Sequence, residues 1–404
     1  MNSCRVCGNN LKEFINFGMM PIANSFKKTI QIDEYKFQMS VGFCENCMTV
    51  QLINQPDPVK MFHENYAFFS SSSNYMQTHF REFANKVIED RLLDKKSIVV
   101  EIGCNDGILL ENFKERKIIS VGIEPSKNVA RIAEKKGIDV INEFFNENVV
   151  NQIVKKFKKA DVILSANVIC HIPDINSIFS GIKKLLASDG LFIFEDPYLL
   201  DIINKNSFDQ IYDEHVFLFS AMSVSYLANK NDLELICVQP QKTHGGSMRY
   251  TIGHKNAHKI DKSVVNQISL EKTNGLHLFK SYCNFEINIL KIKVELINLL
   301  KILKSENKTV VGYAATSKST TLINFFGITS DLLPVIFDTT PNKFNTYSPG
   351  ANIPILPYSL FHESDPDYVL LFAWNHSEEI MTKEASFMKE NRKWILYVPK
   401  LQVI

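Results

Sequence analysis

The sequence predicts an α/β protein of three domains, and three features of its pattern carry that prediction. Strand-like apolar runs alternate with amphipathic helices over residues 66–255, and the alternation returns within 256–404 after a long helical stretch. Strands that alternate with helices favour parallel pairing in one sheet. Ahead of them, residues 1–65 are loop-rich and carry two pairs of cysteines. Because 404 residues are too many for one hydrophobic core, we expect separate domains at 1–65, 66–255 and 256–404.

The strand candidates follow one another in order along both α/β parts. Those of the central part are Ile98–Ile102, Ile119–Ile123, Ile138–Ile141, Val162–Ala166, Leu191–Phe194, Leu235–Val238 and Met248–Ile252. A helical pattern then runs from about 264 to 304. The candidates of the last part are Thr309–Tyr313, Leu333–Phe337, Tyr368–Phe372 and Trp394–Val398.

Charge and hydropathy argue against two classes of partner. Lys and Arg number 45 against 44 Asp and Glu, so the basic excess of a duplex-binding protein is missing. No run approaches the roughly 20 apolar residues that span a bilayer, and the first residues lack a secretory signal. We therefore expect a cytosolic protein that acts without nucleic acid or membrane, as a monomer or a weak homodimer.

Two Cys-x-x-Cys pairs, separated by residues 8–43, predict a metal site in the first domain. In a reducing compartment, paired cysteines favour metal ligation over disulfides. Tetrahedral zinc accepts four thiolates, and a two-residue gap lets one turn present two sulfurs to one ion. Four thiolates leave no open position, so we predict a structural zinc held by Cys4, Cys7, Cys44 and Cys47. Unbound thiols or a redox pair are the alternatives.

A glycine-bearing turn, Glu101–Gly107, follows the first strand candidate of the central part and precedes a helix at Ile108–Lys114. Glycines at such a turn let a ligand approach the backbone closely. Glu124 stands at the end of the next strand, where a carboxylate can accept both ribose hydroxyls of an adenosine-type cofactor. NAD would suit this geometry too, but its fingerprint is GxGxxG and this turn is GxxxG.

The turn resembles the E/DxGxxxG motif of class I S-adenosylmethionine-dependent methyltransferases, a Rossmann-like fold. By this resemblance the turn flanks the methionine part of the cofactor, Glu124 holds the ribose, and Asn142–Phe145 contacts the adenine. The residues predicted to bind the cofactor are Glu101, Gly103, Asn105, Gly107, Glu124 and Asn167. An empty Rossmann-like domain is the alternative.

Two polar groups stand beyond the ends of strands, where ligands bind in an open α/β sheet. Asn167 and His171 follow the fourth strand, and Tyr212-Asp213-Glu214-His215 follows the fifth. Imidazole titrates near neutrality and is the commonest general base, and a neighbouring carboxylate can orient it. A structural or surface role is the alternative for either histidine.

Over its whole length the chain resembles the sugar C-methyltransferases of deoxysugar biosynthesis, which make 3-C-methyl branched sugars on nucleoside diphosphates. The elements that carry the resemblance are the four cysteines, Tyr66 before Ser70–Ser73, the turn EIGCNDG, ANVICHIPD, YDEH, the segment His244–Arg249 and the segment Gly312–Lys318. The resemblance implies a zinc-binding domain, a methyltransferase domain and a C-terminal Rossmann-like domain.

The resemblance also implies a reaction at the carbon beside a ketone. His215 would remove the proton, and Glu214 would orient its neighbours. Tyr212, Tyr66 or His171 would donate hydrogen bonds to the enolate oxygen.

The segment His244–Arg249 would lie near the sugar nucleotide, and Lys318 or Arg249 could pair with the diphosphate or belong to a structural ion pair. Ala314 and Ser319 stand where glycine is expected. We therefore predict that the last domain is a wall of the substrate cleft.

Three alternatives stay open. Asp196-Pro197-Tyr198 superficially resembles the DPPY loop of base methyltransferases, but it lacks the second proline and follows the fifth strand rather than the fourth. A zinc-bearing scaffold with a degenerate methyltransferase fold is disfavoured by the intact cofactor turn. Methylation of another keto substrate, or of a sugar oxygen, is compatible with the sequence.

Overall fold

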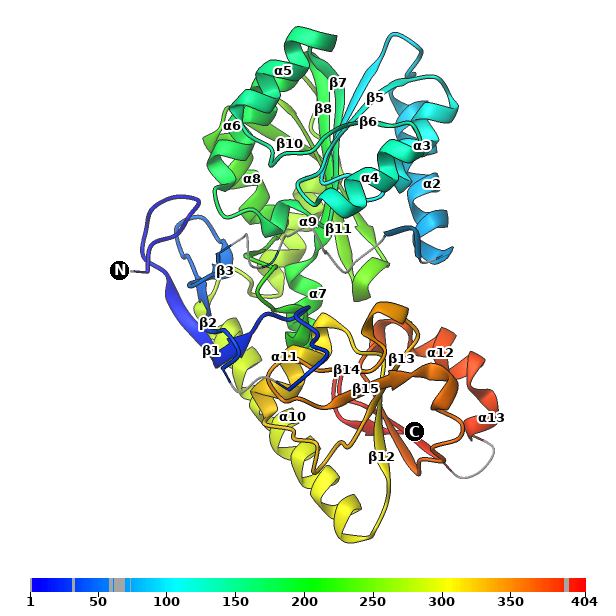
Figure 1. Ribbon diagram of the computed structural model, residues 1–404. Helices are drawn as coiled ribbons and strands as arrows, with labels where there is room; N and C mark the ends of the chain where they lie inside the picture. Colours follow the sequence, from blue (N-terminus) through cyan, green and yellow to red (C-terminus); the bar gives the residue numbers. More distant parts are fainter. Residues whose placement is uncertain (1, 31–32, 58–60, 62–69, 73, 389–391) are drawn as a thin grey trace.

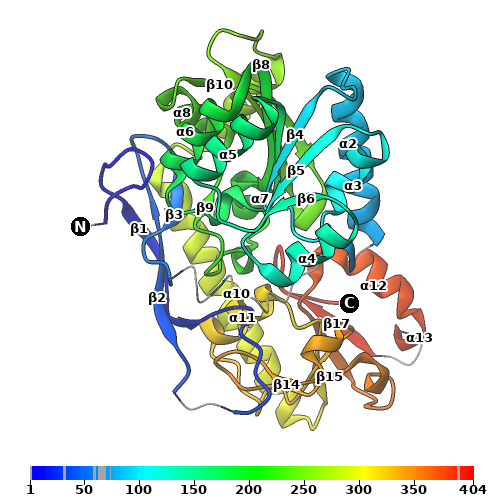
Figure 2. The ribbon, with the colours of Figure 1, turned by 45° about the horizontal axis from the view of Figure 1, so that its top comes forward.

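The strands of the computed structural model form three sheets within the residues that it describes, one of four strands and two of seven. Those residues are 2–30, 33–57, 61, 70–72, 74–388 and 392–404. In Figures 1 and 2 the N-terminal sheet lies beside both of the larger α/β parts. None of the described helices is long and apolar enough to cross a membrane.

The N-terminal sheet is more regular than the loop-rich sequence suggests. It pairs β1 (Lys12–Pro21), β2 (Lys36–Phe43) and β3 (Val50–Leu52) in antiparallel order, and its fourth strand is β9 (Phe217–Leu218) from the central part of the chain. The long strand β1 forms because its aromatic side chains find a partner surface in the last part of the chain. The ring of Phe14 lies 5.0 Å from that of Tyr282, and the ring of Phe17 lies 4.7 Å from that of Phe325.

The central sheet has the strand order β10-β11-β8-β7-β4-β5-β6. Its strands are β4 (Ile98–Ile102), β5 (Ile119–Ile123), β6 (Asp139–Ile141), β7 (Ala160–Ala166), β8 (Leu186–Pro197), β10 (Leu233–Gln241) and β11 (Ser247–His254). The pairs among β4 to β8 are parallel, and β11 runs antiparallel to β8 and β10. The predicted parallel α/β sheet is therefore confirmed.

Helices cover both faces of this sheet, because successive residues of a strand point to opposite sides. Val99 packs in one apolar cluster with α2 (Asn74–Asp90) and α3 (Ile108–Glu115), while Val100 belongs to the cluster on the other face. The remaining helices of this part are α4 (Lys127–Lys135), α5 (Glu147–Phe157), α6 (Ile175–Leu185), α7 (Leu199–Asn204) and α8 (Ala221–Lys230).

The stretch from 264 to 304 holds two helices where the pattern predicts one run. These are α9 (Lys262–Thr273) and α10 (Phe279–Ser305). The chain breaks at Gly275, whose φ of 74° lies in the left-handed region that glycine adopts freely. Its backbone N–H bonds back to the carbonyl of Lys272 and closes the end of α9.

The C-terminal sheet has the order β14-β15-β13-β12-β16-β17-β18, with a parallel centre and an antiparallel strand at each edge. Its strands are β12 (Val310–Tyr313), β13 (Ile336–Asp338), β14 (Thr346–Tyr347), β15 (Pro354–Pro357), β16 (Tyr368–Leu371), β17 (Lys393–Leu396) and β18 (Gln402–Val403). Its helices are α11 (Ser317–Phe326), α12 (Ser377–Lys383) and α13 (Ala385–Met388). The second α/β unit is confirmed, whereas the domain boundaries after 65 and 255 stay predictions, since β9 joins a sheet outside its own stretch.

Candidate functional site

The four predicted cysteines come together at the N-terminal sheet. The Sγ atoms of Cys4 and Cys47 lie 3.5 Å apart, those of Cys7 and Cys44 lie 3.4 Å apart, and all four lie within 4.8 Å of one another. A zinc ion with Zn–S bonds of about 2.3 Å would hold tetrahedral sulfurs about 3.8 Å apart. The cluster therefore fits one zinc ion, with no ligand position left open for chemistry.

A cavity of about 200 Å³ lies beyond the carboxyl ends of β4, β5 and β7. The sequence-predicted residues in its lining are Gly103, Asn105, Glu124, Asn167 and His171. Phe144 and Phe145 also line it, where the adenine contact is predicted. The βα turns of the central sheet thus bring together side chains from three separate strand ends.

Gly103 holds the floor of this cavity for a steric reason. Its φ is 74°, and a Cβ there would stand 2.4 Å from Cγ2 of Val168. A larger residue would have to displace Val168, which itself lines the cavity.

Glu124 carries the carboxylate of the cavity. Its Oε2 accepts the backbone N–H of Asn105 at 3.0 Å, and its Oε1 accepts that of Ser126 at 2.8 Å. Burial raises the pKa of Glu124, while these two N–H groups work in the opposite direction. Each oxygen has a further lone pair, so the carboxylate can still accept ribose hydroxyls.

Glu101 and Gly107 lie behind the cavity and are not among the residues that line it. A Cβ on Gly107 would stand 2.3 Å from Ile138, so this glycine serves the packing of the turn at the start of α3. Burial, with Asp106 and Glu124 nearby, raises the pKa of Glu101 well above its usual range. Both would act on a cofactor through the turn.

Two side chains of α2 and one of a distant loop also line the cavity, and the sequence does not predict them as cavity residues. These are Met76, Phe80 and His244. From the sequence alone, an apolar residue that lines a cavity cannot be distinguished from one that packs in the core, because both lie on the apolar face of an amphipathic helix. His244 stands in the segment expected near the substrate, and its φ of 54° is unusual for a residue other than glycine.

His171 and His215 form a stacked pair at the edge of the cavity. His171 ends the 3-10 turn η2 (Ile169–His171), and His215 follows the turn η3 (Phe208–Gln210). Their ring centres lie 5.3 Å apart at 22°. The fold thus joins the two polar groups that the sequence places after different strands.

The hydrogen bonds of His215 fix its tautomer. Nδ1 lies 2.6 Å from the backbone oxygen of Gln210, which can only accept, so Nδ1 carries the hydrogen. Nε2 then holds the lone pair and accepts the hydroxyl of Tyr212 at 2.8 Å. The arrangement is a neutral imidazole whose basic nitrogen is bonded to a half-buried phenol.

Both imidazoles stay neutral near pH 7. Burial lowers the pKa of His171 to about 3. Burial, with the neighbouring His171 and Lys318, lowers the pKa of His215 well below its usual value. A neutral imidazole can accept a proton, as a general base must.

The two carboxylates of the same loop serve as anchors. Asp213 Oδ1 accepts the backbone N–H of Ala23 at 2.8 Å, and Glu214 Oε1 accepts the side-chain amide of Asn24 at 2.7 Å. Glu214 therefore reaches the N-terminal part of the chain. The remaining predicted catalytic residue, Tyr66, lies outside the described residues.

Lys318 of the C-terminal part, called the cationic wall here, faces the histidines. Lys318 Nζ donates to Oδ1 of Asn375 at 2.9 Å and lies 4.8 Å from the ring centre of Trp374. Burial lowers the pKa of Lys318 to about 8, and the pKa of His244 is lowered to about 3 by burial and by Lys318. Among the described residues no carboxylate lies within ion-pair distance of Lys318, but the charge of the buried Asp209 opposes the effect of burial on its pKa.

Arg249 belongs to a structural ion pair with the buried Glu195. Its Nε donates to Oε1 of Glu195 at 2.5 Å, and its guanidinium lies 3.7 Å from the ring centre of Phe83. The other oxygen of Glu195 lies 2.6 Å from Nε2 of His79. Which of Lys318 and Arg249 would pair with a diphosphate stays a prediction.

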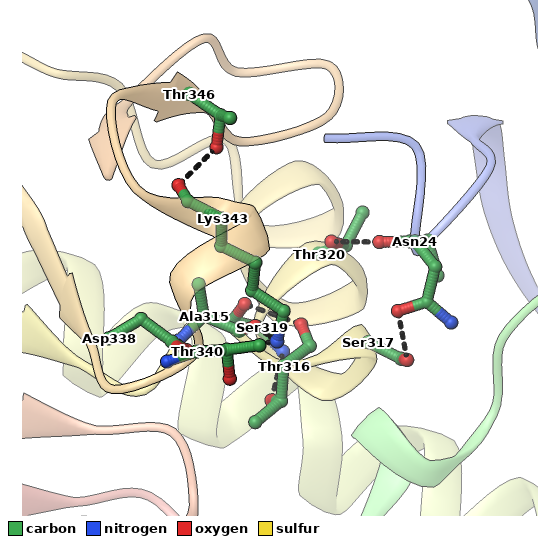
Figure 3. Close-up of polar contacts among 11 residues, drawn as sticks. Asn24, Ala315, Thr316, Ser317, Ser319, Thr320, Asp338, Thr340, Lys343 and Thr346 are labelled. Carbon is green, nitrogen blue, oxygen red and sulfur yellow. Dashed lines mark hydrogen bonds and ion pairs between the residues drawn. The ribbon is translucent and has the colours of Figure 1, made fainter. Parts of the chain in front are cut away.

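The first βα turn of the C-terminal sheet has the same plan as the turn that follows β4. Asp338 ends β13, in the place that Glu124 has after β5, and like Glu124 it accepts two backbone N–H groups. Those of Ala315 and Thr340 donate to its Oδ2 and Oδ1, each at 2.7 Å (Figure 3). The difference is Lys343, whose Nζ lies 3.7 Å from Oδ2 of Asp338 and donates to the carbonyl of Ala315 at 2.7 Å.

Three family models match consecutive parts of the chain. A zinc binding domain matches residues 4–62, a methyltransferase domain matches 75–238, and the C-methyltransferase C-terminal domain matches 242–399.

Among curated proteins, C-methyltransferase NovU of Streptomyces niveus is 29% identical over 410 residues, which cover 100% of this chain and 97% of that protein. A ubiquinone biosynthesis O-methyltransferase of Actinobacillus pleuropneumoniae is 33% identical over 102 residues, covering 24% of this chain and 44% of its own. Among solved structures, an S-adenosylmethionine-dependent methyltransferase from Clostridium acetobutylicum matches with a TM-score of 0.36 and 14% identity, over 46% of this chain and 94% of its own.

Proposed function

We propose a substrate for this enzyme from the premise that the chain is a member of the zinc-containing, S-adenosylmethionine-dependent C-methyltransferases. The proposed reaction is methylation at carbon 3 of a nucleoside-diphosphate-linked 4-keto-6-deoxy sugar. The observation that carries the proposal is the neutral His215, bonded to Tyr212 and stacked on His171 beside the cofactor cavity.

A carbon nucleophile explains why the site needs such a base. A methyl group bonds to carbon only when that carbon carries an electron pair, and a C–H beside a ketone can supply one as an enolate. Because that proton is weakly acidic, a base and a donor to the enolate oxygen must act together. A donor of that kind is worth roughly 3 kcal/mol in comparable sites.

The described residues divide these tasks as follows. Gly103, Asn105, Glu124 and Asn167 would hold S-adenosylmethionine, which would supply the methyl group. His215 would take the proton from carbon 3 on Nε2, the nitrogen that accepts the hydroxyl of Tyr212 in the free protein. The electron pair of that C–H bond would pass through the enolate into the new carbon–methyl bond as the methyl–sulfur bond breaks. His171 and Tyr212 are placed to donate to the enolate oxygen.

The cationic wall supports the nucleotide part of the proposal. Lys318 donates a hydrogen bond to the neutral amide of Asn375, and the buried Asp209 is the carboxyl group whose charge favours the ammonium form. A diphosphate would add negative charge beside this ammonium group.

The test is methyl transfer from labelled S-adenosylmethionine to a panel of nucleoside-diphosphate keto sugars, with their 4-hydroxy counterparts as controls. The expected product has the label on carbon 3, found by NMR. Exchange of the carbon-3 proton with deuterium in the presence of S-adenosylhomocysteine should report the enolate separately. Label on oxygen, or equal use of the 4-hydroxy sugars, would refute the proposed chemistry.

The cytosolic location and the monomer or weak homodimer stay predictions.

A further inference from the structure

We infer that Asn24, on the chain that leaves the zinc-bound sheet, is a positioning residue for the catalytic loop, defined here as residues 211–218. The inference rests on the proposed function only in treating this loop as the one that holds the base. Asn24 lies three residues beyond the end of β1. Its side chain is joined to two other parts of the protein at once.

The amide of Asn24 is held from both sides. Its Nδ2 donates to Oε1 of Glu214 at 2.7 Å. Its Oδ1 accepts the hydroxyl of Ser317 at 2.9 Å, as Figure 3 shows. The reverse orientation of the amide would set its oxygen against the carboxylate oxygen, so the network selects this one. Asn24 therefore links the catalytic loop to the first turn of α11.

The preceding residue repeats the same connection through its backbone. The N–H of Ala23 donates to Oδ1 of Asp213 at 2.8 Å, and its carbonyl accepts the hydroxyl of Thr320 at 2.9 Å. Ala23 is only 1% exposed, so water does not compete for these bonds. Two consecutive residues thus tie two consecutive carboxylates to one helix.

The far end of the loop is fixed to the same N-terminal part. Leu52 donates its N–H to the carbonyl of Val216 at 2.8 Å, and β3 pairs with β9 directly after it. His215 lies between this pairing and the anchored residues Asp213 and Glu214. The base is therefore held at both ends by the N-terminal part. At the first end Asn24 contributes a side chain of that part, and Thr321 contributes one of α11.

The decisive experiment compares Asn24→Ala with the matched control Asn176→Ala in the zinc-loaded enzyme. Asn176 also bonds the N-terminal part to the central part, but it does so through the carbonyls of Arg5 and Val6 rather than through a residue of the catalytic loop. We expect Asn24→Ala to lower kcat by about 10- to 100-fold, in line with the cost of a misplacement near 1 Å. Its affinity for S-adenosylmethionine should stay within about twofold, and the control should leave both quantities unchanged.

A second pair of variants separates positioning from a merely structural role. Asn24→Asp sets two carboxylates against each other, whereas Asn24→Asp with Glu214→Gln restores the bond with donor and acceptor exchanged. Asn24→Asp should therefore cost much less activity in the Glu214→Gln background than in the wild type. An equal cost in both backgrounds, or an unchanged kcat in Asn24→Ala, would overturn the inference.

Hydrogen exchange distinguishes a failure of this inference from a failure of the proposed substrate. The peptide that covers 211–218 should exchange faster in Asn24→Ala than in the wild type and in Asn176→Ala, with no sugar present. If no sugar is methylated but this exchange rises, the proposed substrate is wrong and the inference stands. If the wild type methylates the sugar and Asn24→Ala leaves both the exchange and kcat unchanged, the inference is wrong and the proposed substrate stands.

Discussion

The cofactor cavity and the catalytic loop lie side by side, yet they are built in different ways. The cavity is formed mainly by the ends of three neighbouring strands of one sheet. Its lining includes Gly103, Glu124 and Asn167, each of which directly follows one of these strands. The loop is held by bonds that span 190 residues to Asn24 and 110 residues to Thr321. The cavity therefore depends mainly on one sheet, while the geometry of the base depends on how three parts of the chain assemble. Damage to one should be separable from damage to the other.

His215→Asn is expected to give the largest difference between the effect on methyl transfer and the effect on cofactor binding. If the imidazole takes the proton, methyl transfer should slow by about 10²–10⁴-fold, the usual contribution of a positioned base. Affinity for S-adenosylmethionine, measured by calorimetry, should hardly change, because the loss falls on the transition state. Deuterium exchange at carbon 3 should slow with it. If His171→Ala abolishes that exchange while His215→Ala keeps normal turnover, the base is His171.

Removal of zinc tests the same comparison without a substitution in the cavity or in the catalytic loop. A chelator should release the metal from the four thiolates and loosen β3, which pairs with β9 beside His215. We expect turnover to fall by about 10²-fold, the cost of a misplaced group, with affinity for S-adenosylmethionine little changed. Metal content, turnover and calorimetry on one sample test this, and zinc should restore the turnover. Equal loss of both functions would show that the two regions are not independent.

Glu124→Ala tests the cavity side, with Asp338→Ala as its matched control. Loss of a carboxylate that accepts ribose hydroxyls should cost about 1.5–3 kcal/mol per charged hydrogen bond, measured as weaker cofactor binding. Asp338 has the equivalent place in the C-terminal sheet and also accepts two backbone N–H groups, but it lies beside the ammonium group of Lys343. Its removal should lower stability and leave cofactor affinity unchanged. The same loss of affinity in both variants would mean that the cofactor has been placed in the wrong sheet.

The smallest effect concerns His244, which lines the cavity and faces the cationic wall. Its folded pKa of about 3 lies below the ordinary value, so between these values only the unfolded state gains the proton. Its contribution to the free energy of unfolding is therefore lost as the pH falls. Asparagine tolerates the positive φ of this position, so His244→Asn is a suitable replacement. Between pH 7.5 and 5, its free energy of unfolding should fall by about 2 kcal/mol less than that of the wild type. Chemical denaturation at both pH values measures this difference, and parallel losses would contradict the buried neutral state.

The cofactor cavity is the region that the sequence predicts well, because its residues have fixed places relative to strands. Gly103 follows β4 and Glu124 follows β5, so recognising the strands is enough to bring both to one edge of the sheet. Glu101 and Gly107 share that motif but lie behind the lining, since the motif also contains residues that only pack the turn.

The catalytic loop is predicted only in part. The sequence indicates which side chains are chemically able to act, but not that Glu214 turns to Asn24 or that Lys318 reaches the histidines. Those contacts depend on the docking of separate sheets, for which local periodicity holds no information. The sequence does not predict strand β1 for the same reason, since its aromatic side chains pack against helices almost 270 to 310 residues later in the chain.

Lys318 links the charge of the proposed substrate to the basicity of His215. Burial and the neighbouring His171 keep the pKa of His215 well below its usual value, and Lys318 adds to this effect. A diphosphate beside Lys318 would offset the contribution of Lys318 and so raise the pKa of the imidazole. Under the proposed function, binding of the substrate would therefore make His215 a stronger base.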